Sequence, residues 1–287
     1  MTKKYLLYAF FMWGSLVACT DDPDDTITPV EDLAALNLAM GNPSGAETDE
    51  NYEDNYLIEL PQYTLSYHRD RGIPNWVSWY LNEEWLGNVT RRDDFRAYEL
   101  LPAGWYRVDE DDYDYGNNGF DRGHNCPSAD RTRSINDNSN TFYMINMIPQ
   151  SPKHNGEMWN ELEQYCRDLV DRGNELYILM GCFGAGGVGN AGYREKLAGG
   201  KITVPRYIWK SILVLPKGNN DLDRIDQNTR IISVLTENKN STSGQPWGNY
   251  RVSVDEIEAA TGYNLFSMLP VSVQEEIEAV VDDGPVQ

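Results

Sequence analysis

Short runs rich in aromatic and β-branched residues recur along the chain from about residue 56 onward. Runs of this kind, bounded by Gly, Pro, Asn and Asp, are typical of β-strands. The six clearest are QYTLSYH (62–68), NWVSWYL (75–81), TFYMINMI (141–148), ELYILMGCF (175–183), YIWKSILVL (207–215) and RIISVLT (230–236). Because regular helical crossovers do not separate consecutive runs, the pattern predicts an α+β domain with a central antiparallel or mixed β-sheet.

Helical periodicity is clearest from residue 155 to about residue 172. Apolar residues recur there at intervals of three and four positions, which is the period of a helix with one buried face. These residues are Met158, Leu162, Tyr165 and Leu169. Two Ser-x-x-Glu sequences later in the chain have the spacing of a helix capping box. Ser253 with Glu256, and Ser272 with Glu275, therefore predict two short closing helices.

The first 19 residues, MTKKYLLYAFFMWGSLVAC, have the character of an export signal. Two lysines precede an apolar run that is too short to span a bilayer comfortably and is typical of a signal peptide. The run ends in LVAC, which resembles the lipobox of bacterial lipoproteins. We therefore expect a signal peptide over residues 1–18 and acylation of Cys19, which would anchor the exported protein to a bacterial outer membrane, with the cell surface left open as its location. An ordinary secretory signal is the alternative.

Residues 19–55 are acidic, contain Pro and Gly, and lack sustained periodicity. We expect a flexible tether there and one folded domain over residues 56–287. The formal net charge of the whole chain is −21. Affinity for phosphates comes mainly from Lys and Arg that displace counterions, so a chain this acidic has no general attraction to nucleic acids. Any polyanion must bind at a local site.

One of the three histidines lies in a strongly polar segment, NNGFDRGHNCPSADRT (117–132). Imidazole has an unperturbed pKa of about 6.5, so His124 suits the abstraction of a proton from water near neutral pH. Considered alone, it is equally well a hydrogen-bonded loop histidine. Downstream, Asn155, Trp159 and Glu163 recur at intervals of four on one side of the expected helix. Asn155 and Glu163 offer oxygen atoms, which hard divalent cations prefer as ligands.

DRGHNCPSADR (121–131) followed by NMIPQSPKHNGEMWNELE (146–163) resembles the DNA/RNA non-specific endonuclease family, the ββα-metal or His-Me finger nucleases. The family pattern has D-R-G-H, then N-x-x-P-Q, then N-x-G-x-W-x-x-L-E, and every element is present in order. The resemblance extends from about Tyr63 to Gln274. It implies a ββα-metal motif within the α+β fold, and an enzyme that hydrolyses phosphodiester bonds of DNA and RNA and leaves 5′-phosphate ends. Nothing resembles a reader of base sequence.

The resemblance also implies roles for individual residues. His124 would be the general base that activates a water molecule, and Asn155 would be the direct protein ligand of one Mg²⁺, with Mn²⁺ as the other metal that such a site accepts. Glu163 would hold metal-bound waters.

Three further residues receive supporting roles from the same resemblance. Arg122, within DRGH, would contact phosphate or support the site. An upstream arginine would neutralise charge on the phosphoryl oxygens, and Arg92 fits the spacing to Phe95 better than Arg91 does. Asn146 would support the site by hydrogen bonding, or serve only as a strand amide.

Other motifs favour weaker readings. GAGGVG (184–189) matches the glycine pattern of a dinucleotide site, but no long amphipathic helix follows it, so a flexible glycine loop is the better interpretation. The spacing of Cys126, Cys166 and Cys182 is unlike that of structural zinc sites. Cys126 and His124 could form a thiol hydrolase only through an unusual local turn. A non-catalytic surface lipoprotein that binds polysaccharide or protein is the alternative to the nuclease.

Overall fold

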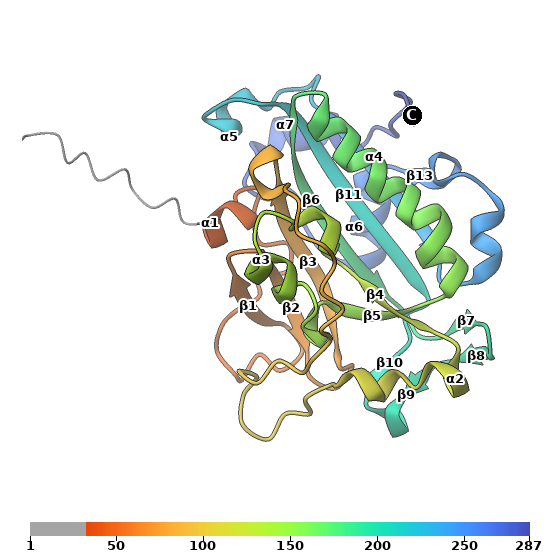
Figure 1. Ribbon diagram of the computed structural model, residues 1–287. Coiled ribbons are helices and arrows are strands. Elements are labelled where there is room, and N and C mark those ends of the chain that lie inside the picture. Colours follow the sequence, from red (N-terminus) through yellow and green to blue (C-terminus); the bar gives the residue numbers. More distant parts are fainter. Residues whose placement is uncertain (1–32) are drawn as a thin grey trace, which may run out of the picture. The chain divides into compact units, whose positions relative to one another are not determined.

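The computed structural model describes residues 33–287, so the expected signal peptide, Cys19 and the first part of the tether lie outside the described residues. A seven-stranded antiparallel sheet forms its centre, in the order β1-β2-β3-β6-β11-β12-β13 (Figure 1). Its strands are β1 (Tyr56–Leu60), β2 (Tyr63–His68), β3 (Ile73–Leu81), β6 (Asn174–Phe183), β11 (Tyr207–Pro216), β12 (Arg230–Glu237) and β13 (Arg251–Val252). The expected α+β class with an antiparallel sheet is confirmed.

Three two-stranded ladders lie outside this sheet and pair β4 with β5, β7 with β8, and β9 with β10. Their strands are β4 (Asp121–His124), β5 (Met147–Gln150), β7 (Gly187–Gly189), β8 (Gly192–Arg194), β9 (Lys196–Leu197) and β10 (Ile202–Thr203). The second half of the glycine motif at 184–189 therefore forms strand β7 of the β7–β8 hairpin, and no helix follows it directly.

Five of the six expected strands are present, and the segment 141–148 differs. A 3₁₀ turn (Met144–Asn146) occupies its centre, and only Met147 and Ile148 belong to a strand, β5. Met144, Ile145 and Met147 are all buried. A short, fully buried apolar run does not alternate between faces, so its pattern cannot separate a strand from a buried turn.

The helices are α1 (Leu33–Asn37), α2 (Tyr115–Asn118), α3 (Ile135–Asn140), α4 (Asn160–Asp171), α5 (Asp221–Arg224), α6 (Val254–Thr261) and α7 (Val271–Ile277). Ser253 caps α6 as expected, because its side chain accepts a hydrogen bond from the backbone N–H of Glu256. The second expected cap is wrong. Helix α7 begins at Val271 directly after Pro270, which places Ser272 inside its first turn.

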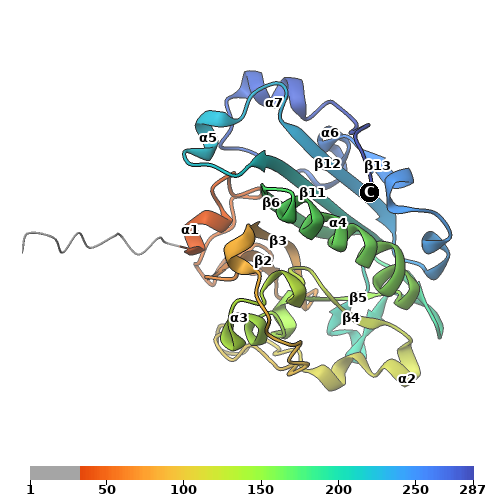
Figure 2. The same ribbon diagram turned by 45° about the horizontal axis from the view of Figure 1, so that its top comes forward.

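Helices cover both faces of the large sheet (Figure 2). Neighbouring residues of a strand point to opposite faces. On β11, Nζ of Lys210 lies 3.5 Å from Oε1 of Glu163 on α4, whereas Trp209 packs against Tyr263, just after α6, with ring centroids 6.5 Å apart. Helix α4 and the α6 segment therefore lie on opposite faces. All nine residues of β3 are buried, as expected for a strand covered on both sides.

Residues 33–55, which we expected to belong to the tether, pack against the sheet. The side-chain amide of Asn37 donates to the backbone oxygens of Leu60 and Pro61, at 3.1 and 3.3 Å. Met40 and Ala46 are each only 4% exposed. Trp76 and Asn75 on β3 also donate to Ser44 and to the backbone oxygen of Asp54, at 2.8 and 2.7 Å. Residues 33–55 therefore belong to the folded part, and the domain boundary expected at residue 56 lies too far along the chain.

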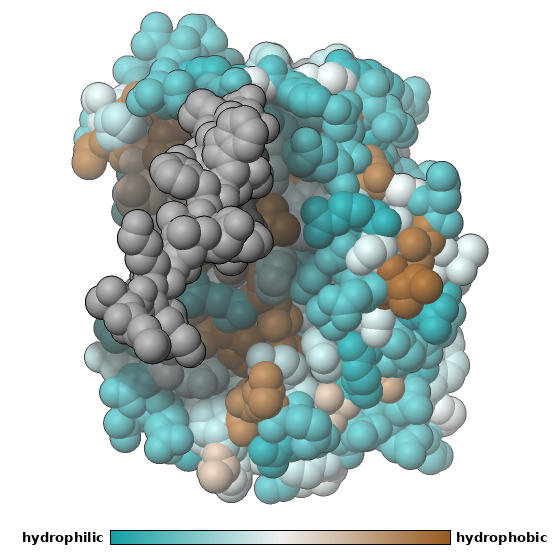
Figure 3. Space-filling view, turned by 60° about the vertical axis from the view of Figure 1, so that its left-hand side comes forward, coloured by the Kyte–Doolittle hydropathy of each residue, from teal (hydrophilic) through white to brown (hydrophobic). Residues whose placement is uncertain are grey.

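The surface reflects the hydrophilic composition of the chain. Hydrophilic residues make up most of the face drawn in Figure 3, and hydrophobic residues are grouped in patches between them. Within residues 33–287, none of the helices combines the length and apolar character needed to cross a membrane.

Candidate active site

A short β-hairpin brings two parts of the polar motif together. Strand β4 pairs antiparallel with β5, with Asp121 opposite Gln150 and His124 opposite Met147. A Cβ atom at Gly123 would lie 2.1 Å from Oε1 of Gln150, so only glycine fits there. The close pairing fixes the DRGH segment against the start of the helical segment that follows β5.

A buried histidine ties this hairpin to the large sheet. Nδ1 of His154 lies 2.8 Å from Nε2 of Gln150, and Nε2 of His154 lies 2.8 Å from Oγ1 of Thr236 on β12. Burial, followed by the positive charge of Lys210, lowers the pKa of His154 to about 3. The ring is therefore neutral at pH 7, and both of its nitrogens serve the structure.

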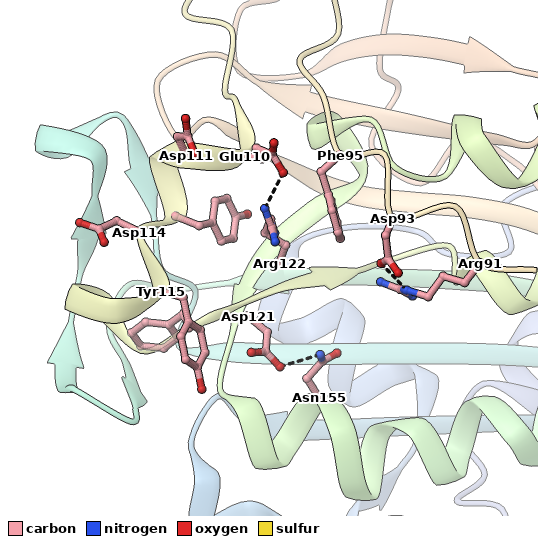
Figure 4. A pocket seen from close by; sticks show the side chains of 12 residues that line it. Arg91, Asp93, Phe95, Glu110, Asp111, Asp114, Tyr115, Asp121, Arg122 and Asn155 are labelled. Atoms are coloured by element: carbon pink, nitrogen blue, oxygen red, sulfur yellow. Dashed lines mark hydrogen bonds and ion pairs between the residues drawn. The ribbon is translucent and has the colours of Figure 1, made fainter.

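Asn155 lies in a π-helical turn (His154–Trp159). We expected an α-helix from residue 155, which is wrong for this turn, since α4 begins only at Asn160. The side-chain Nδ2 of Asn155 donates to Oδ2 of Asp121 at 2.9 Å. The amide nitrogen must face the carboxylate, so Oδ1 of Asn155 points away from Asp121 (Figure 4). Turns of this type often occur at functional sites.

The hairpin and the π turn line a cleft of about 520 Å³ (Figure 4). Other lining residues come from the segment 91–95 and from a 3₁₀ turn (Glu110–Tyr113) with the residues after it. The charged side chains are two arginines and five acids, namely Arg91, Arg122, Asp93, Glu110, Asp111, Asp114 and Asp121. Because the acids outnumber the arginines, the cleft by itself repels a polyanion.

Both cleft arginines are held by an acid and an aromatic ring. The guanidinium of Arg122 lies 4.1 Å from the ring centroid of Phe95, and its Nη1 is 3.0 Å from Oε2 of Glu110. Nε of Arg91 is 2.6 Å from Oδ1 of Asp93. Arg92, which we favoured from the sequence, is exposed and does not line the cleft. The structure therefore brings Arg91, and not Arg92, to this site.

His124 is buried beside the cleft, with 8% of its surface exposed. Its ring centroid lies 4.8 Å from that of Phe142 and 5.6 Å from that of Phe95, which lines the cleft. Its Nε2 has no hydrogen-bond partner among residues 33–287. Burial, followed by the charges of Arg91 and Arg122, lowers the pKa of His124 well below its usual value. The imidazole is therefore neutral at pH 7 and able to accept a proton.

Comparison with known proteins shows the family of this chain. The family model described as DNA/RNA non-specific endonuclease matches residues 41–272. The chain belongs to the DNA/RNA non-specific endonuclease family. A protein named Nuclease from Nostoc sp. (strain PCC 7120 / SAG 25.82 / UTEX 2576) is 44% identical to this endonuclease over 257 residues, which cover 90% of each chain. A protein named Nuclease from Serratia marcescens is 26% identical over 247 residues, or 85% of each chain.

The fold of this endonuclease also occurs in a solved structure. A chain in the crystal structure of the EndoG/EndoGI complex superimposes with a TM-score of 0.69 at 22% identity, covering 86% of this chain and 96% of that chain. The family assignment makes the protein an enzyme that hydrolyses nucleic acids, and the alternative of a non-catalytic binding lipoprotein is wrong.

Asn146 holds the segment that follows His124 in this endonuclease through three hydrogen bonds. Its side-chain oxygen accepts from the backbone N–H of Cys126 at 3.0 Å, and its nitrogen donates to the backbone oxygens of Cys126 and Thr141, each at 2.9 Å. These bonds hold the chain directly after His124. Asn146 is fully buried, so it lies behind the site and not in the cleft.

Glu163 is not among the residues that line the cleft. Its side chain is 15% exposed and faces the buried Lys210. Nζ of Lys210 also lies 5.0 Å from the ring centroid of Trp159, and Trp159 stacks on His154 with centroids 5.1 Å apart. Burial raises the pKa of Glu163, and Lys210 opposes this increase. Glu163 thus belongs to a buried set that supports the turn carrying Asn155.

The three cysteines within residues 33–287 belong to the interior of this endonuclease. Cys126, Cys166 and Cys182 are all free and buried. Burial raises the pKa of the Cys126 thiol to about 12, so this side chain is not a thiolate nucleophile near neutral pH. Our interpretation of Cys126 as a small buried side chain is confirmed.

Asp121 was not singled out from the sequence, although it stands within DRGH. Its role depends on a contact with Asn155, which is 34 positions away in the chain. The one signal that could have indicated it was the presence of a carboxylate three residues before the candidate base, on the same short strand.

Proposed function

We propose that this enzyme is a metal-dependent endonuclease that cleaves both DNA and RNA without strong sequence preference and leaves 5′-phosphate ends. The observation that carries the proposal is the shared cleft. It combines two arginines with the Asn155 amide, beside a buried neutral imidazole. Phosphodiester hydrolysis requires a base that takes a proton from water and positive charge that stabilises the phosphoryl oxygens, and those groups can supply both.

A divalent cation such as Mg²⁺ or Mn²⁺ fits the donor atoms at Asn155. The hydrogen bond to Asp121 orients the amide so that Oδ1 is left available, and the carboxylate of Asp121 adds negative charge beside it. Burial raises the pKa of Asp121, whereas Asn155 and Arg122 lower it, so a second positive charge nearby favours the ionised form. When bound, the cation would offset charge on the phosphate and on the leaving oxygen.

The protein side chains supply the remaining chemistry. Neutral His124 takes a proton from a water molecule, whose oxygen attacks phosphorus. Arg91 and Arg122 hold the phosphoryl oxygens, which gain negative charge as the new bond forms. The bond from phosphorus to the 3′ oxygen then breaks, and that oxygen takes a proton from solvent. The products are a 5′-phosphate and a 3′-hydroxyl.

Glu163 and Asn146 act through other residues in this scheme. We assigned Glu163 to the waters around the cation from the sequence, but its contact with Lys210 favours a positioning role behind Asn155. Asn146 holds the backbone that follows His124.

The proposal is tested by incubating plasmid DNA and RNA with the protein in Mg²⁺, in EDTA, and with His124→Ala in Mg²⁺. We expect both substrates to be degraded only by the wild type with Mg²⁺. The DNA fragments should be joined by a ligase without prior phosphorylation, as 5′-phosphate ends require. Equal degradation in EDTA, or by His124→Ala, would overturn the mechanism.

We also propose that the enzyme is exported and anchored by lipid on Cys19 to a bacterial outer membrane. This proposal is supported by the lysines, the apolar run and the LVAC sequence at residues 1–19.

A further inference from the structure

Three carboxylates from two helices meet at a second place in the fold. Asp255 and Glu258 are three residues apart on α6, and Glu278 directly follows α7. One carboxylate oxygen from each lies within 4.8 Å of the others. The backbone N–H of Asp255 also donates to the backbone oxygen of Glu278 at 3.1 Å, so the end of α7 is docked on the first turn of α6. None of these three residues lines the active-site cleft.

Glu278 is the unusual member of this group. It is only 4% exposed, and its Oε1 has no hydrogen-bond donor among residues 33–287. None of the three carboxylates has a Lys, Arg or His partner in the part of the chain that the structure describes. A buried carboxylate without a donor or a cation is costly, and two like charges beside it increase the cost.

We propose that Asp255, Glu258 and Glu278 form a Ca²⁺ site that ties α6 to the end of α7. Ca²⁺ binds carboxylate oxygens at about 2.3–2.6 Å, so two oxygens on one ion are at most about 4.6–5.2 Å apart. Oxygens that all lie within 4.8 Å of one another are compatible with this limit. Ca²⁺ accepts several carboxylates in irregular geometry, whereas Mg²⁺ keeps most of its waters. Asp255 is exposed, so the site is open to solvent on one side.

Sharing of a proton is the competing explanation for this cluster. Burial, together with the negative charges of Glu258 and Asp255, raises the pKa of Glu278 to about 8. One oxygen of Glu258 accepts from the backbone N–H of Leu265 at 2.7 Å, which leaves its other oxygen available in either case. A proton would relieve the repulsion without any metal. Only the metal site predicts that the protein binds Ca²⁺ here and that its stability responds to Ca²⁺.

The test is thermal unfolding of the full-length protein in EDTA, in CaCl₂ and in MgCl₂ at pH 7.5. For the wild type, we expect the midpoint to rise by about 5–10 °C when Ca²⁺ exceeds its dissociation constant a hundredfold, with a smaller rise in MgCl₂. Glu278→Gln loses this rise. Glu276→Gln is the matched control, because Glu276 is exposed on α7, the helix that Glu278 directly follows, and it keeps the rise. Asn155→Ala also keeps it, which separates this site from the active-site cleft.

Asp255→Asn is the second variant, since an exposed side chain can be changed without disturbing the core. It should lower the affinity for Ca²⁺ in a titration calorimeter while leaving the midpoint in EDTA unchanged or higher. A wild-type midpoint that is the same in EDTA and CaCl₂ would overturn the proposal and favour the shared proton. So would a Ca²⁺ response that is equal in the wild type, Glu278→Gln and Asp255→Asn.

Discussion

Replacing Asp121 with alanine removes the group that orients the amide of Asn155. The hydrogen bond from Nδ2 of Asn155 to Oδ2 of Asp121 is 2.9 Å long and has a carboxylate as its acceptor. Hydrogen bonds to charged groups contribute about 1.5–3 kcal/mol. At about 1.4 kcal/mol for each factor of ten, loss of this bond should weaken the binding of Mg²⁺ by about 10–150-fold. Without this bond, the amide can rotate and present its NH₂ group where a bound cation would need the amide oxygen.

The assay is the initial rate of DNA hydrolysis as a function of Mg²⁺ concentration. We expect Asp121→Ala to raise the Mg²⁺ concentration that gives half-maximal rate, and high Mg²⁺ to recover part of the rate. Asp121→Asn keeps a neutral acceptor for Asn155, so its loss should be several-fold smaller. Asp111→Ala is the matched control, because Asp111 lines the same cleft without bonding to Asn155. If Asp121→Ala and Asp111→Ala had the same effect on the Mg²⁺ dependence, the reasoning would be refuted.

Four further predictions concern single residues. His124→Ala should lower kcat/KM by about 10²–10⁴-fold. As the pH is lowered, the wild-type rate should stay constant past pH 6.5 and fall only when His124 gains a proton at its lowered pKa. A fall in rate with its midpoint at or above pH 6.5 would contradict this. Arg91→Ala should lower kcat by about 100-fold and Arg92→Ala only slightly, and the reverse order in a steady-state assay would contradict the placement in the cleft. Glu110→Gln frees Arg122 from an exposed ion pair worth about 0.2–1 kcal/mol, so KM for DNA should fall by up to about 5-fold, whereas a rise would show that Glu110 helps to bind substrate. Cells fed labelled palmitate should label the wild type and not Cys19→Ser, and label on the variant would exclude Cys19 as the acylated residue.

The large sheet could be predicted from the sequence because its strands are rich in aromatic and β-branched residues. β2, β3, β6, β11 and β12 all lie where the runs indicated. The segment around Met144 could not be assigned, because burial on all sides removes the alternation that identifies a strand. The packing of residues 33–55 could not be predicted either, because it depends on contacts between residues distant in sequence, such as Asn37 with Leu60.

The candidate site was predictable where the chemistry is local in sequence. The motif predicted His124 and Asn155 as site residues, and the structure places His124 on β4 and Asn155 in the π turn that follows its partner strand β5. The choice between Arg91 and Arg92 failed, because neighbouring residues in irregular backbone point in different directions and spacing alone does not decide which one enters the cleft. Glu163 does not line the cleft. A π turn precedes α4, and a uniform helical period does not represent the change of angle that this turn introduces.

The most direct test of the central claim measures whether His124 lies near a cation bound at Asn155. Mn²⁺ is paramagnetic and broadens the NMR signals of nearby nuclei, and the chain has only three histidines to assign. In protein labelled at histidine, we predict that equimolar Mn²⁺ broadens the imidazole signals of His124 and that Asn155→Ala removes this broadening. Sharp His124 signals in the wild type with Mn²⁺ bound and DNA hydrolysis supported would contradict the account.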